Sequence, residues 1–180
     1  PSLIKPATRT GFLAQAVVRL MLQSGLLPDG AVQLIMGRTG PLLDVLDCQD
    51  VVGFTGSAAT ALSLRSTPNI LTNSVRFTAE QDSLNGSLLG PDVMPGSPEF
   101  DLFITEVHRE MITKAGQKCT AIRRIMVPKP HLLAVQTALT ERLAVTQIGH
   151  PALKETQMGP LSSTRQRQDV LAQSRLISDS

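Results

Sequence analysis

The sequence contains no tryptophan and no tyrosine, and aromatic residues make up only 3% of its 180 positions. The formal net charge is +2, and the lysines and arginines are scattered rather than clustered. Proteins that bind nucleic acids stack bases on aromatic side chains and follow the phosphates with a basic surface. The composition therefore argues against nucleic acid as a partner.

Long apolar runs and metal-binding clusters are also missing. No run reaches the roughly 18 apolar residues that a membrane-spanning helix needs, so we expect no membrane partner. The two cysteines, Cys48 and Cys119, form no C-x-x-C pair, and the three histidines share no spacing, which argues against a disulfide framework and a metal site. Free thiols suit a reducing compartment, and we predict a cytoplasmic location.

The sequence does contain 42% hydrophobic residues, in a pattern that alternates between strands and helices. Apolar residues at helical spacing predict a helix over Thr10–Ser24, which we expect to be largely buried because most of its surface is apolar. The elements expected next are a strand over Ala31–Met36, a short helix over Pro41–Leu46, a strand over Val51–Thr55 and a helix over Ala58–Ser66. Such alternation is typical of an α/β fold with a parallel sheet covered by helices.

The second half of the chain predicts further strands and helices. The strands are expected over Ser74–Ala79, Gly86–Leu89 and Arg123–Val127, and a last helix over Ser162–Arg175. An amphipathic helix over Glu99–Lys114 has one apolar face, made of Phe100, Phe103, Val107 and Met111. A helix over His131–Leu143 is expected to bury Leu132, Leu139 and Leu143.

Cys119 lies in the connector Gly116–Thr120, between a long helix and a strand. A cysteine in such a connector can be exposed to a substrate, but it attacks only as a thiolate, which needs a nearby base or cation. Lys118 is one candidate for that cation. The alternative is a small buried hydrophobic residue. Position alone favours the buried alternative, and it does so more strongly for Cys48, which lies at an apolar helix end.

Two further features carry alternatives of the same kind. Glu80 ends a strand-like run, where a carboxylate can act as a general base or simply be a solvated loop acid. The stretch Gly53–Ser57 runs from a strand into a helix through small residues. The backbone N–H groups at such a helix start attract anions, so the turn is either a phosphate site or an ordinary capped helix.

Taken together, these motifs resemble the aldehyde dehydrogenase superfamily. They occur in the order and spacing of that family along nearly the whole chain: Lys5-Pro6-Ala7, Gly53-Phe54-Thr55-Gly56-Ser57, Glu80, Gly116-Gln117-Lys118-Cys119-Thr120, Ile148-Gly149-His150-Pro151 and Met158-Gly159-Pro160-Leu161.

The resemblance implies a fold and two catalytic residues. Residues 1–82 would form the later part of a Rossmann-like cofactor domain, and residues 83–180 the start of the catalytic α/β domain. Cys119 would attack the aldehyde, giving a thiohemiacetal and then a thioester, and Glu80 would activate the water that hydrolyses it.

The resemblance also implies a nicotinamide cofactor, held by Lys5, Gly56 and Ser57. In relatives that prefer NAD, a glutamate follows the ribose-binding lysine by three residues, and here that position is Thr8, followed by Arg9. A carboxylate repels a 2′-phosphate, whereas Thr8 does not and Arg9 can attract it. We therefore predict NADP over NAD.

The stretch from Glu80 to Asn85 departs from the usual E-L-G-G-K of the family. This variant, with the run from Glu106 to Arg124, is similar to the dehydrogenase domain of bifunctional phenylacetate-degradation proteins, which oxidise a CoA-linked semialdehyde. A related branch, which acts in the benzoyl-CoA epoxidation route, is the alternative. Because Glu80 is retained, the resemblance favours a free acid as the product.

Several family landmarks do not occur in this sequence, including an upstream oxyanion asparagine, a downstream E-x-F-G-P segment and the oligomerisation strand. We therefore expect the isolated chain to be inactive, or nearly so. For the parent enzyme, the resemblance implies a homo-oligomer. Two other interpretations remain: a nucleotide-binding fragment without chemistry, or a structural domain on a dehydrogenase-like scaffold.

Overall fold

The computed structural model describes residues 1–179 and divides the chain into two compact units. Unit 1 comprises Pro1–Gln81, and unit 2 begins at Asp82. Within the described residues, no helix has both the length and the apolar character that crossing a membrane requires.

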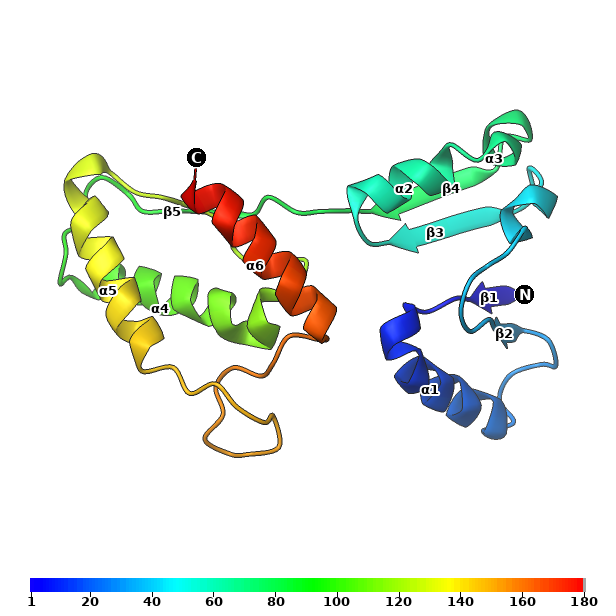
Figure 1. Ribbon diagram of the computed structural model, residues 1–180, viewed down its shortest axis with the longest axis horizontal. Helices are drawn as coiled ribbons and strands as arrows, with labels where there is room; N and C mark the ends of the chain where they lie inside the picture. The colour runs from blue at the N-terminus through cyan, green and yellow to red at the C-terminus, as the bar shows by residue number, and fades with distance from the viewer. Residues whose placement is uncertain (180) are drawn as a thin grey trace. The chain divides into compact units, whose positions relative to one another are not determined.

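Unit 1 is built from two pairs of parallel strands (Figure 1). Strand β1 (Ser2–Ile4) pairs with β2 (Val32–Leu34), and β3 (Val51–Thr55) pairs with β4 (Arg76–Glu80). Parallel neighbours need a long crossover, which is usually helical. Helix α1 (Gly11–Gln23) connects the first pair, and α2 (Ala58–Arg65) and α3 (Pro68–Thr72) connect the second. This arrangement confirms the α/β class.

The short helix α3 was not expected from the sequence. Pro68 is its first residue, where the fixed φ of proline suits a helix and the missing N–H costs no hydrogen bond. The side chain of Asn69 then donates to the carbonyl oxygens of Leu43 and Leu46, at 3.0 and 2.6 Å. These bonds fix α3 against the 3₁₀ turn Leu42–Val45, a long-range contact that no local pattern reveals.

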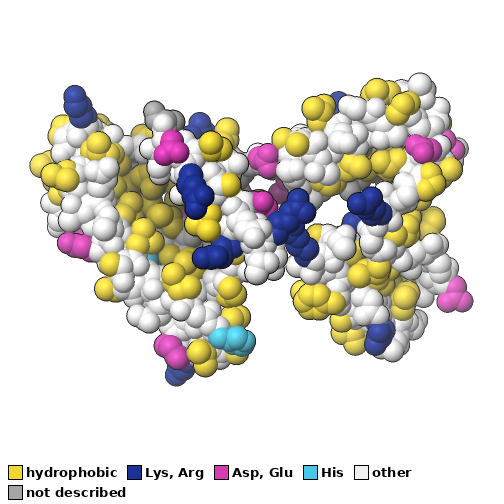
Figure 2. All heavy atoms as spheres, viewed as in Figure 1, with side chains coloured by type: hydrophobic (Ala, Val, Ile, Leu, Met, Phe, Trp, Pro, Cys, Tyr) yellow, Lys and Arg dark blue, Asp and Glu magenta, His cyan; other side chains and the backbone are white. Residues whose placement is uncertain are grey.

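Helix α1 forms where predicted, but the expectation that it is largely buried is wrong. Only Gly11 and Val18 are buried, whereas Phe12 and Leu20 are 73% and 68% exposed. Helix α1 packs against β2, and a pair of three-residue strands covers only one stripe of a helix that is apolar nearly all round. Hydrophobic side chains consequently appear on the surface of this unit (Figure 2).

Unit 2 contains a third pair of parallel strands, β5 (Gly86–Leu88) and β6 (Arg124–Met126), and three α-helices. The helices are α4 (Pro98–Ile112), α5 (Leu132–Ala144) and α6 (Thr164–Ser178), and α4 packs against α5. The side chain of Ser97 accepts a hydrogen bond from the Phe100 N–H and so caps α4, whose first turn also carries Glu99 and Asp101. A capping hydroxyl and acidic residues both stabilise the positive end of a helix.

The core of unit 2 lies between α4 and α5. The predicted face of α4 is confirmed: Phe100 and Val107 are buried, and Phe103 and Met111 pack against them. The predicted face of α5 is partly wrong. Leu139 is buried together with Val135, but Leu132 and Leu143 are 48% and 38% exposed. These two residues lie at the ends of α5, beyond the central turns that pack on α4.

Ile104 tests this core directly because it is 1% exposed at the centre of α4. We expect Ile104→Ala to lower the free energy of unfolding by about 2–5 kcal/mol, because the lost side chain leaves a cavity. Leu102, in the same helix, is 62% exposed and provides the control. Leu102→Ala is expected to change stability by no more than about 0.5 kcal/mol. Guanidinium denaturation followed by circular dichroism measures both; equal effects would contradict the described core.

Candidate functional site

The carboxyl ends of β3 and β4 bring three of the predicted site residues together. In the register of the two strands, Thr55 lies beside Glu80, and the Gly56 N–H donates to the Glu80 carbonyl at 3.1 Å. The turn Gly56–Ser57 and the last residue of β4 therefore share one edge. Ligands of open parallel sheets bind at this edge, beyond the carboxyl ends of the strands.

Gly56 leaves room for the ring of Phe54 in this turn, and a larger residue would require that ring to move. A Cβ at this position would lie 2.5 Å from the ring Cζ of Phe54, closer than real Cβ atoms approach other heavy atoms. Ser57 is the N-cap of α2: its hydroxyl accepts a hydrogen bond from the Thr60 N–H at 3.3 Å and donates to the Thr60 hydroxyl. The capped helix is thus present, and a phosphate contact by this hydroxyl stays a prediction.

The start of α2 is suited to an anion. Its first turn contains no acidic residue, so no carboxylate neutralises the positive end of the helix dipole. At Gly56 no side chain projects, so a ligand can approach the backbone closely. These two observations fit the pyrophosphate of a dinucleotide, which binds through the N–H groups of a helix start.

The carboxylate of Glu80 is exposed and forms no ion pair or hydrogen bond with any of residues 1–179. A carboxylate without a fixed partner is free to accept a proton from water.

The carboxyl end of β1 carries the other predicted cofactor residues. Lys5 follows the strand and donates to the Pro6 carbonyl at 2.7 Å, and exposed Thr8 and Arg9 form the 3₁₀ turn Thr8–Thr10.

Cys119 is exposed, so the expectation of a buried thiol is wrong for this residue. After α4 ends at Ile112, Lys114, Ala115 and Gly116 all have positive φ, of 52°, 52° and 70°. This left-handed turn carries the chain away from the helix axis. Left-handed φ is costly for residues other than glycine, by roughly 1–2 kcal/mol each, so surrounding contacts must hold this conformation.

Cys48 is also exposed, again against expectation. The 3₁₀ turn before it ends at Val45, and the chain then enters a tight turn in which the Asp47 N–H bonds to the carboxylate of Asp50. The apolar helix end that predicted burial therefore stops before the cysteine. Both cysteines are free and exposed to solvent, so Cys48 can serve as the control for Cys119 in tests of thiol reactivity.

Lys118 is already engaged by a carboxylate. Its ammonium donates to Glu110 Oε1 at 3.0 Å and lies 2.9 Å from Oε2, with both side chains largely shielded from solvent at 22% and 16% exposure. The charge of Lys118 is balanced by Glu110 in the last turn of α4, and an effect of Lys118 on the neighbouring thiol stays a prediction. The pair anchors the Cys119 loop to that helix.

Three polar side chains fix the rest of the loop. Gln117 donates to the Lys114 carbonyl at 2.9 Å and accepts from the Ser162 N–H at 3.2 Å. Asn85 donates to the Cys119 carbonyl and Arg123 to the Gly116 carbonyl. Asn85 and Arg123 were not singled out in the sequence, because their partners are defined only by the tertiary fold. Of the three, only Gln117 belongs to the cysteine motif Gly116–Thr120.

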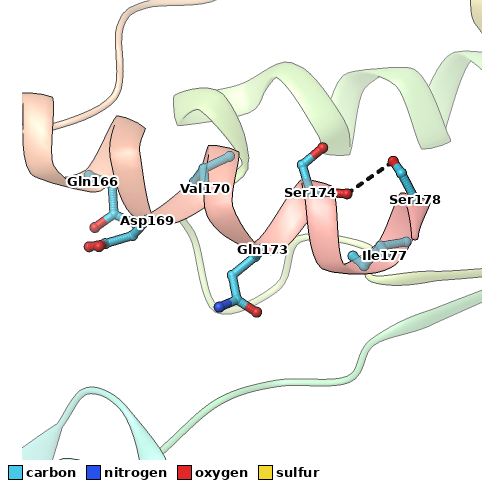
Figure 3. A pocket seen from close by; sticks show the side chains of 7 residues that line it. All are labelled: Gln166, Asp169, Val170, Gln173, Ser174, Ile177 and Ser178. Carbon is cyan, nitrogen blue, oxygen red and sulfur yellow. Dashed lines mark hydrogen bonds between the residues drawn. The ribbon is translucent and has the colours of Figure 1, made fainter. Parts of the chain in front are cut away.

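The candidate residues thus fall into the two separately described units. Unit 1 contains Lys5, Thr8, Arg9, Gly56, Ser57 and Glu80, and unit 2 contains Cys119. A surface hollow of about 420 Å³ in unit 2 lies along one face of α6 and includes no candidate residue (Figure 3). It is lined by Gln166, Asp169, Val170, Gln173, Ser174, Ile177 and Ser178.

Known proteins resemble this chain along almost its whole length. It is 47% identical over 168 residues to the 3,4-dehydroadipyl-CoA semialdehyde dehydrogenase of Aromatoleum evansii, covering 93% of this chain and 32% of the relative. It is 31% identical over 178 residues to the N-succinylglutamate 5-semialdehyde dehydrogenase of Hahella chejuensis, covering 93% and 34%. The chain therefore spans about a third of the length of these relatives.

The fold has counterparts among solved structures. The crystal structure of betaine aldehyde dehydrogenase from Staphylococcus aureus in complex with NAD⁺ superposes with a TM-score of 0.83 at 26% identity. The match covers 96% of this chain and 33% of that one. The family model described as "Aldehyde dehydrogenase family" matches residues 2–178. Because that family model matches nearly every residue of this chain, the chain belongs to the aldehyde dehydrogenase family.

Proposed function

We propose that the chain acts within a longer aldehyde dehydrogenase that oxidises a CoA-linked semialdehyde to the free acid, with Cys119 as the nucleophile. The observation that carries this proposal is the exposed thiol of Cys119 on a loop held by several side chains. Such fixed geometry is what nucleophilic catalysis requires, because the attacking atom must be placed against the carbonyl carbon. Since the chain covers about a third of its relatives, we expect the isolated 180 residues to show no turnover.

The backbone N–H of Cys119 supports this role. Within residues 1–179 it has no hydrogen-bond acceptor. When the thiolate adds to the aldehyde carbon, the carbonyl π electrons move to oxygen, and the new oxyanion of the thiohemiacetal lies next to this donor. Backbone N–H groups aimed at a developing oxyanion are among the largest contributions to catalysis of this kind.

The turn Gly56–Ser57 and the start of α2 would hold the pyrophosphate of a nicotinamide dinucleotide, and Lys5, Thr8 and Arg9 its ribose end. When bound, that cofactor supplies the acceptor for the hydride that leaves the substrate carbon. The Staphylococcus aureus structure was solved with NAD⁺. For this chain we propose NADP, because Thr8 places no carboxylate where a 2′-phosphate would lie and Arg9 is adjacent.

Glu80 completes the proposed reaction. The thioester left on Cys119 is attacked by water, Glu80 accepts a proton from that water, and the thiolate departs as the acid is released. The unpaired, exposed carboxylate described above fits a residue that must reach water. Hydrolysis at this step gives a free acid rather than a new thioester.

The name of the Aromatoleum evansii relative supports a CoA-linked semialdehyde as the substrate class. We propose an intermediate of phenylacetate degradation, with the benzoyl-CoA epoxidation route as the alternative. Turnover rates of the purified enzyme with the semialdehyde of each route decide between them. In either case we propose a cytoplasmic homo-oligomer.

Replacing Cys119 tests the nucleophile. We expect Cys119→Ala in the full-length enzyme to lower kcat more than about 1,000-fold, because no other group forms the covalent intermediate. Cys48→Ala removes the other exposed thiol and is expected to leave kcat within about twofold, as for most exposed positions. The steady-state rate at which reduced cofactor forms gives kcat for both variants. Substantial activity in Cys119→Ala contradicts the proposed mechanism.

Glu80→Gln tests the hydrolysis step. Without the base, the thioester accumulates, so kcat should fall about 10²- to 10⁴-fold while the first turnover still produces a burst of reduced cofactor. Glu155→Gln, at an exposed position of unit 2, is the control and should retain full kcat. The burst is followed by stopped-flow absorbance. If Glu80→Gln loses the burst as well, Glu80 acts before thioester formation and its proposed role is wrong.

Thr8→Glu tests the cofactor preference. A carboxylate close to a 2′-phosphate is expected to reduce kcat/KM with NADP at least about tenfold, since like charges at about 4 Å repel by ~1 kcal/mol per unit pair even in water. The value with NAD should change little. Thr140→Glu, which adds the same charge to the exposed side of α5, controls for net charge. A wild-type enzyme that strongly prefers NAD contradicts the assignment.

A further inference from the structure

We propose that Arg123 and Asn85 are positioning residues that orient the backbone N–H of Cys119 for binding the oxyanion. This inference rests on the proposed role of Cys119 and assigns functions to two side chains for which the sequence analysis predicted no role. Neither side chain is placed in contact with the substrate. Both act through the peptide groups on either side of the nucleophile.

The first contact fixes the peptide group that precedes Cys119. Arg123 Nη2 donates to the Lys118 carbonyl at 3.3 Å and to the Gly116 carbonyl at 3.0 Å. The Ala121 N–H also donates to the Lys118 carbonyl, at 3.2 Å. In a trans peptide the C=O and the next N–H point in opposite directions. Holding the Lys118 carbonyl therefore sets the direction of the Cys119 N–H, which points away from these donors.

The second contact fixes the peptide group that follows Cys119. Asn85 Nδ2 donates to the Cys119 carbonyl at 2.6 Å and to the Ala121 carbonyl at 3.2 Å. With a side-chain donor on each flanking carbonyl, neither peptide plane can rotate without breaking a hydrogen bond. The backbone torsions of Cys119, and with them the direction of its N–H, are then defined by the fold.

The two contacts are linked to each other and to the β5–β6 pair. The Asn85 carbonyl accepts from the N–H groups of Arg123 and Arg124, at 2.8 and 3.1 Å. Asn85 directly precedes β5, and Arg124 is the first residue of β6. These hydrogen bonds attach the Cys119 loop to a pair of hydrogen-bonded strands, which are more rigid than a loop alone.

The guanidinium has an electronic effect as well as a geometric one. A charged donor on an amide oxygen polarises the amide and makes its N–H a stronger donor, since hydrogen bonds in a chain reinforce one another. Arg123 acts on the Lys118 oxygen, which belongs to the same amide as the Cys119 N–H. A neutral loop residue would supply orientation at best.

The test uses Arg123→Ala, Arg123→Lys and Asn85→Asp in the full-length enzyme, with Arg165→Ala on the exposed side of α6 as the control. Lysine keeps the charge but has one point donor in place of the fork, and aspartate replaces the Asn85 donor with an acceptor. Each variant is assayed for kcat, KM, melting temperature and the rate at which iodoacetamide alkylates Cys119. Alkylation needs the thiolate but no oxyanion site.

We expect kcat to fall about 10- to 100-fold in Arg123→Ala and Asn85→Asp, less than the loss of a whole oxyanion donor, with KM and the alkylation rate within twofold. Arg123→Lys should recover part of the loss, and Arg165→Ala should match the wild type. An unchanged kcat in these variants, or a parallel fall in kcat, alkylation and melting temperature, overturns the inference. Cys119→Ala is run alongside: if it retains activity, the proposed function itself fails, whereas its inactivity beside fully active Arg123 and Asn85 variants removes only the positioning role.

Discussion

The hydrogen bonds to the two carbonyl groups that flank Cys119 are the contacts on which the proposed chemistry depends. The chain reaches this cysteine through three residues of left-handed φ, a conformation that is unfavourable for Lys114 and Ala115. It persists because Glu110 holds Lys118 and because Asn85 and Arg123 hold the backbone itself. The strain and its compensation place an exposed thiol beside an N–H that has no acceptor among residues 1–179. A covalent intermediate with an oxyanion requires this arrangement.

In unit 1, the parallel strands position the general-base candidate and the candidate cofactor turn. The pairing of β3 with β4 places Glu80 next to the glycine turn that begins α2, so a proton acceptor and an anion-binding helix start share one edge. Parallel strands end at the same side of a sheet, and this geometric fact, rather than sequence proximity, brings together residues more than twenty positions apart. The betaine aldehyde dehydrogenase structure from Staphylococcus aureus has a similar fold over 96% of this chain.

The sequence predicted most elements to within a few residues, because periodic apolar patterns reflect local geometry. The apolar face of α4 and the parallel class of the strands were confirmed for this reason. The failures share a different cause: burial depends on what packs against an element. Helix α1 has the composition of a core helix but packs chiefly against β2 and the 3₁₀ turn Thr8–Thr10. Leu132 and Leu143 lie beyond the packed turns of α5, and both cysteines follow turns that carry them to the surface. Asn85 and Arg123 could not be selected either, since an asparagine before a strand and an exposed arginine are unremarkable until their carbonyl partners are known.

The most direct measurement of the central claim is mass spectrometry of the full-length enzyme after mixing with the CoA-linked semialdehyde and NADP, with acid quenching during the first turnover. The account predicts that the acyl group of the substrate is found on the peptide that contains Cys119, with none on the peptide that contains Cys48. Turnover without any acyl adduct on Cys119, or an adduct on Cys48 instead, would contradict it.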